Sequence, residues 1–168
     1  MKVQPLTPII GAEVSGLNLC RLTDHQFDGL NDAFTEHSVL FFRDQDAMAP
    51  ADQIAFAKRF GPLHTHPAAP TLDEQAEIFV IHAHKDSKIA NGNGWHTDVS
   101  CDEEPPLATM LQLHLLPKTG GDTLFASMYA AYETLSEPMK AFLLTLEAHH
   151  ESEHIYRGRY ADRGASDE

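Results

Sequence analysis

Apolar residues recur at helical spacing in two stretches of the first third of the chain. The first stretch follows Thr23, which can cap the free backbone N–H groups, with Gln26 at the capping-box position. The second begins at Pro50, a favourable first residue of a helix, and Gly61-Pro62 ends it. Both stretches are therefore predicted to be helices. Two shorter helices are expected later, from Ser127 to Tyr132 and from Ser136 to about Leu146.

Other segments are rich in β-branched, aromatic and leucine residues and are bounded by Gly or Pro. Strands are predicted within Val3–Leu19, Ser38–Phe42, Glu77–His82, Leu107–Leu115 and Thr123–Ala126. With helices mostly outside this strand-rich centre, the pattern predicts an α+β protein built around an antiparallel sheet or barrel. We expect one domain over residues 1–168. Because the chain turns polar after Tyr156 and no closing element follows, we expect the domain to be truncated at its C-terminus.

Composition narrows the classes of partner. The formal net charge is −13, which argues against nucleic acid or an anionic membrane as a partner, since both favour a basic surface. Two cysteines imply no disulfide framework, and the sequence shows no apolar run of transmembrane or signal length. The prediction is a cytoplasmic protein, with a homo-oligomer left open.

The candidate chemistry lies at His96-Thr97-Asp98. On an extended backbone, side chains at i and i+2 point to the same face, with Cα atoms about 6–7 Å apart. A neutral imidazole and a carboxylate there can converge on one metal ion, and this donor set suits iron(II). Trp95 is predicted to anchor the strand in the core, and Asp102-Glu103-Glu104 to form a solvated turn. A lone His-x-Asp is common by chance, so the flanking segments decide its meaning.

Five segments in order resemble the taurine dioxygenase (TauD/TfdA-like) family of 2-oxoglutarate-dependent oxygenases. They are Ile10-Gly11-Ala12-Glu13-Val14-Ser15-Gly16, Val39-Leu40-Phe41-Phe42-Arg43-Asp44-Gln45, Phe60-Gly61-Pro62-Leu63-His64-Thr65-His66-Pro67, Trp95-His96-Thr97-Asp98-Val99 and Thr119-Gly120-Gly121-Asp122-Thr123-Leu124-Phe125. The resemblance covers essentially the whole chain. It implies a double-stranded β-helix (jelly roll) core with flanking helices, incomplete in this chain.

The resemblance also implies roles for individual residues. His96 and Asp98 match two iron ligands, and Thr123 matches a residue that holds the far carboxylate of 2-oxoglutarate. His66 would contact the anionic group of the substrate. Val99 and Tyr156 match positions that face the substrate. The third iron ligand and the arginine that pairs with 2-oxoglutarate are expected beyond residue 168.

The implied reaction is the hydroxylation of a small anionic substrate, a sulfonate, sulfate ester or carboxylate, with iron(II), 2-oxoglutarate and oxygen, giving succinate and carbon dioxide. Taurine-specific relatives carry an aromatic residue where this chain has Pro67-Ala68-Ala69-Pro70, which makes taurine itself a weaker candidate. One alternative is a non-catalytic β-barrel domain that binds a metal or ligand. Another is a jelly-roll hydrolase or isomerase that uses zinc. Without the resemblance, His64 and His66 would be read as surface residues of a proline-flanked loop.

Overall fold

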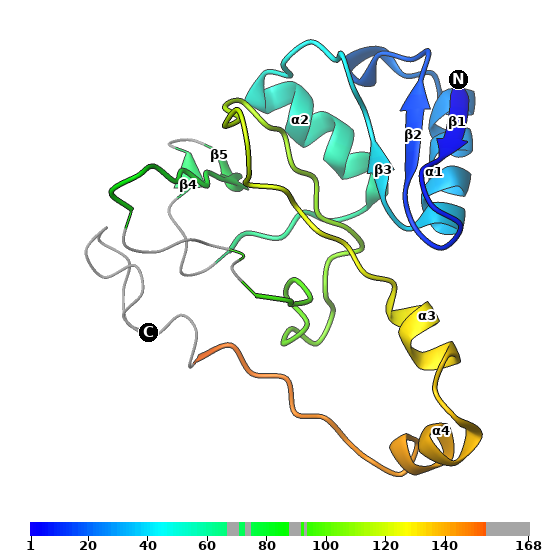
Figure 1. Ribbon diagram of the computed structural model, residues 1–168. Coiled ribbons are helices and arrows are strands. Elements are labelled where there is room, and N and C mark those ends of the chain that lie inside the picture. Colours follow the sequence, from blue (N-terminus) through cyan, green and yellow to red (C-terminus); the bar gives the residue numbers. More distant parts are fainter. Residues whose placement is uncertain (67–70, 73–74, 88–91, 93, 154–168) are drawn as a thin grey trace. The chain divides into compact units, whose positions relative to one another are not determined.

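The computed structural model describes residues 1–66, 71–72, 75–87, 92 and 94–153 (Figure 1). The chain divides into two compact units. The first comprises residues 1–47 and 112–147, and the second comprises residues 48–111 and 148–168. Tyr156, predicted to face the substrate, lies outside the described residues.

A three-stranded sheet organises the first unit. Its strands are β1 (Lys2–Pro5), β2 (Ala12–Ser15) and β3 (Leu40–Phe41), in the order β1-β2-β3. β1 pairs antiparallel with β2, as predicted, whereas β2 pairs parallel with β3. The parallel pairing follows from the connection, because the chain returns to the sheet through a helix rather than through a tight turn. The structure therefore confirms the α+β arrangement, but the sheet is mixed rather than wholly antiparallel as predicted.

Helix α1 (Asp24–His37) begins as its sequence predicts. Thr23 Oγ1 accepts from the Gln26 backbone N–H, and Gln26 Oε1 accepts from the Thr23 N–H, which completes the capping box. At the other end Ser38 adopts a left-handed conformation (φ 62°) and its N–H donates to the Phe34 carbonyl. A short 3-10 helix, η1 (Leu19–Arg21), precedes α1.

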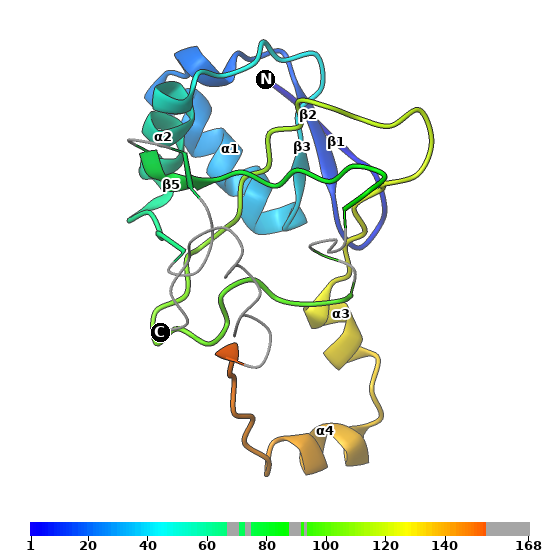
Figure 2. The ribbon, with the colours of Figure 1, turned by 90° about the vertical axis from the view of Figure 1, so that its left-hand side faces the viewer.

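The core of this unit lies between α1 and the sheet (Figures 1 and 2). Ala12 and Val14, two residues apart on β2, point to the same face and are buried. Leu30 and Ala33 are buried on α1, and Leu19 of η1 is also buried. Removing a side chain of the size of Val or Leu from water stabilises the fold by about 1.5–3 kcal/mol, so this small core holds helix and sheet together.

The second unit contains a helix and a two-stranded hairpin. α2 (Pro50–Ala57) starts at its proline as predicted and continues into the 3-10 helix η2 (Lys58–Phe60) before Gly61. Phe56 is buried and meets the Phe60 ring edge to face, with 5.4 Å between centroids. The antiparallel strands β4 (Thr71–Leu72) and β5 (Gln75–Phe79) form the hairpin. β5 ends three residues before the predicted end at His82.

The predicted strands Leu107–Leu115 and Thr123–Ala126 are not formed. Both segments are irregular, and their leucines are largely exposed, with Leu115 at 81%. Among the described residues no strand pairs with either segment, and a strand without a partner leaves its backbone groups to water. The jelly roll implied by the resemblance is likewise not formed by the described residues.

Between these two segments a glycine turn is sharply defined. Gly120 and Gly121 both have positive φ, 75° and 76°. A Cβ on Gly121 would lie 3.2 Å from Pro117 Cγ, so glycine is needed there for both reasons. Beyond the turn the Phe125 ring packs edge to face on Phe41 of β3, with centroids 5.8 Å apart.

Helices α3 (Met128–Glu133) and α4 (Glu137–Leu143) follow the turn. Ser127 caps α3 through the Ala130 N–H, as predicted, whereas Ser136 makes no side-chain cap bond to α4. α4 ends at Leu143, before the predicted end at Leu146.

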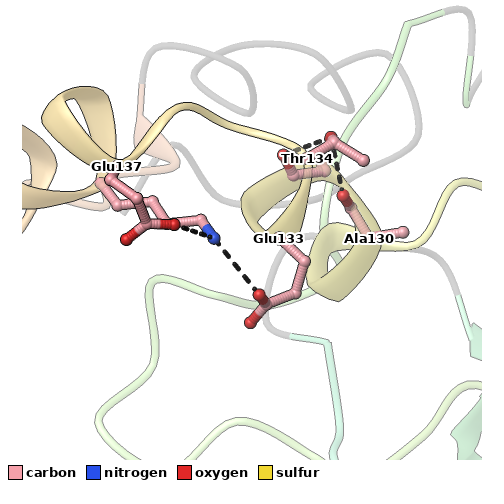
Figure 3. A network of polar contacts seen from close by, with 6 residues as sticks. Ala130, Glu133, Thr134 and Glu137 are labelled. Atoms are coloured by element: carbon pink, nitrogen blue, oxygen red, sulfur yellow. Dashed lines mark hydrogen bonds and ion pairs between the residues drawn. The ribbon is translucent and has the colours of Figure 1, made fainter.

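A polar network joins the two helices (Figure 3). Lys140 Nζ lies 3.2 Å from Glu137 Oε1 and 3.3 Å from Glu133 Oε2, and it sits over the Tyr132 ring. Glu137 and Glu133 together raise the pKa of Lys140, and the bond to Glu137 has the largest effect. Figure 3 also shows the Thr134 hydroxyl donating to the Ala130 carbonyl, which closes the end of α3.

Of the helices in the described residues, none is long and apolar enough to cross a membrane. Cys20 and Cys101 are exposed free thiols.

Candidate metal centre

The backbone around His96 and Asp98 is a loop that runs into a turn. Residues 95–97 have no regular structure, and a turn covers residues 98–101. Val99 adopts a left-handed conformation (φ 52°), which is costly for a β-branched residue, and the Asp102 N–H donates to the Val99 carbonyl. The predicted extended strand is therefore wrong, because the chain reverses directly after Asp98.

The two side chains nevertheless converge. His96 Nε2 lies 3.2 Å from Asp98 Oδ1. Both side chains are accessible, with exposed fractions of 56% for His96 and 48% for Asp98. The two side chains that the sequence singled out thus lie close together, although a turn rather than strand alternation follows them.

A backbone carbonyl sets the state of the imidazole. His96 Nδ1 lies 2.8 Å from the Gly94 carbonyl oxygen. Since a carbonyl only accepts hydrogen bonds, this contact places a proton on Nδ1, and the other ring nitrogen, Nε2, faces Asp98. Such a bond to the second ring nitrogen is the usual way in which proteins orient a metal-binding histidine.

The carboxylate is held in a similar way. Thr109 Oγ1 donates to Asp98 Oδ2 over 2.7 Å, so one oxygen is occupied and the other faces His96. His96 Nε2 and a carboxylate oxygen of Asp98 therefore face one another, a contact that either a proton or a metal cation can bridge.

The donor spacing fits a divalent metal ion. Neighbouring ligands of an octahedral ion at about 2.1 Å lie about 3.0 Å from one another, and His96 Nε2 and Asp98 Oδ1 are 3.2 Å apart. An imidazole with a hard carboxylate oxygen suits iron(II). Within the part of the chain that the structure describes, no group of three His, Cys, Asp or Glu side chains is placed to hold a metal ion.

Trp95 is 71% exposed, so the prediction that it lies in the core is wrong. The prediction relied on a paired strand, and the segment is a loop with no sheet face for the indole within the described residues.

His66 lies in a cluster with His64, Phe79 and Asp102, in the same unit as His96 and Asp98. Its ring is 5.8 Å from that of Phe79 and meets the His64 ring edge to face at 6.1 Å. Burial lowers the pKa of His66, and the neighbouring His64 lowers it further. At neutral pH His66 is therefore an uncharged imidazole, which can donate one N–H to an anion.

Asp102 belongs to this cluster. Its Oδ2 lies 3.2 Å from His64 Nε2, so it is not only the solvated turn residue that was predicted. No sequence signal identified this contact, which spans residues far apart in the chain, nor the bond from Thr109 to Asp98.

The remaining predicted site residues lie in other surroundings. Thr123 is exposed in the irregular segment of the first unit, after the Gly120-Gly121 turn. Val99 is half-buried next to Asp98. His150 Nδ1 lies 3.0 Å from the Ser100 hydroxyl oxygen.

Relatives of known activity match nearly the whole chain. An alkylsulfatase of Acinetobacter baylyi is 38% identical over 94% of this chain and 49% of its own length. An alpha-ketoglutarate-dependent sulfate ester dioxygenase of Pseudomonas putida is 33% identical over 93% of this chain and 51% of its own length. The chain thus spans about half the length of these relatives.

A solved taurine dioxygenase from Burkholderia xenovorans is similar in structure, with a TM-score of 0.73 and 35% identity. The match covers 84% of this chain and 50% of that one. The model of the taurine catabolism dioxygenase TauD, TfdA family matches residues 2–167. Enzymes of this family that depend on alpha-ketoglutarate use iron(II), 2-oxoglutarate and oxygen. Together with the paired His96 and Asp98, these matches show that the chain belongs to the TauD/TfdA family of dioxygenases.

Proposed function

We propose that this chain acts as an iron(II)- and 2-oxoglutarate-dependent dioxygenase that hydroxylates a small anionic substrate, with sulfate esters and sulfonates as the first candidates. The observation that most supports this proposal is that His96 Nε2 and Asp98 Oδ1 lie 3.2 Å apart. Each of the two side chains is also oriented by a hydrogen bond with a neighbouring group. The sulfate ester and sulfonate activities named for relatives suggest the substrate class. We further propose the family's double-stranded β-helix as the fold of the complete domain.

In this proposal His96 and Asp98 hold iron(II), which supplies oxygen activation coupled to the decarboxylation of 2-oxoglutarate to succinate. Thr123 donates its hydroxyl to the far carboxylate of 2-oxoglutarate. His66, neutral because burial lowers its pKa, donates an N–H to the anionic group of the substrate. Val99 lies beside the substrate, and the Tyr156 side chain also faces it.

Hydroxylation of the carbon that carries the anionic group explains how one site can serve several substrates. The hydroxylated carbon collapses to an aldehyde, and the C–O bond to sulfate or the C–S bond to sulfonate breaks with release of the anion. The recognised feature is then the anionic group, and the remainder of the substrate can vary. The half-buried His66 beside Phe79 fits a site with one polar contact and an apolar wall.

The test uses the protein expressed from its natural gene, supplied with iron(II), ascorbate, 2-oxoglutarate and alkyl sulfates or alkyl sulfonates of increasing chain length. We expect equal amounts of succinate and of released sulfate or sulfite, dependent on oxygen. His96→Ala should abolish both products, and His114→Ala, which changes an exposed histidine outside the site, should not. Equal turnover by His96→Ala would refute the site.

A second candidate is a domain that binds a metal or an anion without oxidation. It is favoured by the finding that the described residues contain no third metal ligand. The same experiment separates the two candidate functions. A binding domain should bind a metal in a way that depends on His96, but it should form no succinate with any of the substrates.

A further inference from the structure

The Thr109 hydroxyl holds one oxygen of Asp98. The Oγ1–Oδ2 distance of 2.7 Å is that of a well-formed hydrogen bond from a hydroxyl to a carboxylate oxygen. Thr109 lies eleven residues after Asp98, in the irregular segment that was predicted to be a strand. It is not one of the residues to which the family resemblance gives a role.

This bond decides where the other oxygen points. The terminal torsion of an aspartate is broad, so a free carboxylate samples many planes. With Oδ2 anchored on Thr109, Oδ1 faces His96 Nε2 at 3.2 Å. The Gly94 carbonyl does the same for the imidazole ring. Each metal-binding side chain is thus held by one neighbour that is not itself a ligand.

We propose that Thr109 is a positioning residue that sets the metal affinity of Asp98. The proposal rests on the proposed function, since it takes His96 and Asp98 as metal ligands. Two ligands that are oriented before the ion arrives lose less conformational freedom on binding. The bond also leaves Oδ1 as the oxygen that binds the ion, so it favours one-oxygen coordination and keeps other positions of the metal open.

A purely structural role makes a different prediction. If the bond only tied the 98–101 turn to the segment around Thr109, its loss would lower the free energy of unfolding and leave metal affinity unchanged. A positioning role changes the affinity for the metal and the signals of its coordination. The two roles are therefore separable by measuring both quantities.

The experiment titrates cobalt(II), which gives visible absorption bands sensitive to coordination, into the protein from its natural gene. Thr109→Val removes the hydroxyl at nearly constant shape, and Thr109→Ser restores it. We expect Thr109→Val to weaken cobalt(II) binding by about 10-fold and to alter the bands, as for other partners of metal-binding side chains. Thr109→Ser should retain the wild-type affinity and bands. Thr119→Val, the same change at another exposed threonine, should also retain them.

The outcomes are distinguishable from failure of the proposed function. If cobalt(II) binding in the wild type does not depend on His96, the metal site and this inference both fall. If binding depends on His96 but Thr109→Val binds as tightly as the wild type, only the inference is overturned. It is also overturned if Thr109→Ser weakens binding as much as Thr109→Val, because the hydroxyl would then not be the cause.

Discussion

Strand β2 and the segment of residues 107–116 are both rich in apolar side chains, yet they meet different surroundings. β2 has β1 on one edge and β3 on the other, and α1 covers its apolar face. Val14 is 1% exposed as a result. Within the described residues the 107–116 segment has no neighbouring strand, and Leu115 is 81% exposed. A strand is therefore a property of a pair of segments, and only the first region contains its own partners.

The largest change in the free energy of unfolding should come from shortening a side chain in the core between α1 and the sheet. Leu30 on α1 is 1% exposed, so Leu30→Ala is expected to lower the free energy of unfolding of the protein by about 2–5 kcal/mol. Leu115→Ala, the same change in the exposed segment, is expected to alter it by less than about 0.5 kcal/mol. Urea unfolding followed by circular dichroism measures both. A cost for Leu115→Ala as large as that for Leu30→Ala would break the comparison, since it would mean that the segment is packed in solution.

The glycine turn tests whether the exposed region is nonetheless specified. Gly121→Ala should cost about 1–2 kcal/mol, because alanine must adopt a positive φ and its Cβ would meet Pro117. Gly120→Ala shares the positive φ, but nothing lies within 4 Å of its Cβ, so it should cost less. Equal and negligible costs in urea unfolding would mean that the turn is not maintained.

Helix caps give a smaller effect, which compares α1 beside the core with the exposed α4. Thr23→Ala removes the capping box of α1 and should cost about 1 kcal/mol. Ser136→Ala precedes α4 but removes no side-chain cap bond, so a smaller loss is expected. Thermal unfolding of both variants measures the difference, and a greater loss for Ser136→Ala would contradict the cap assignment.

These cases show what the sequence could and could not predict. The capping box was readable because Thr23 and Gln26 are three residues apart and need no partner elsewhere. The strands at 107–115 and 123–126 were mispredicted because their formation depends on distant partners. The predicted burial of Trp95 was wrong for the same reason, because it was inferred from a strand that does not form.

The candidate site divides in the same way. The proximity of His96 and Asp98 could be predicted because the two residues are neighbours in sequence, although the backbone conformation that joins them was mispredicted. The bond from Thr109 to Asp98 spans eleven residues and depends on how the loop returns. The contact of Asp102 with His64 spans more, and no local pattern predicts it.

His66 is half-buried, so its exposure lies between that of the core residue Val14 and that of Leu115. The pH dependence of its contribution to the free energy of unfolding is the smallest effect that we expect. Burial lowers its pKa in the folded protein below the value of about 6.5 that it has when unfolded. Between these two pKa values the unfolded chain binds the proton more readily, so unfolding becomes easier as the pH falls. The stability contribution of neutral His66 is therefore complete above about pH 6.5, declines as the pH falls toward the folded pKa, and then levels off.

The measurement is the free energy of unfolding between pH 8 and pH 5 for the wild type and for His66→Gln, which cannot be protonated. The wild type should lose stability relative to the variant below about pH 6.5. Asp102 is one of the groups that raise the pKa of His66 against the effects of burial and of His64. In Asp102→Asn the decline should thus extend to lower pH. A difference between wild type and His66→Gln that stays constant with pH would show that His66 is solvated in the folded protein, and the proposal that it binds an anion as a neutral imidazole would lose its physical basis.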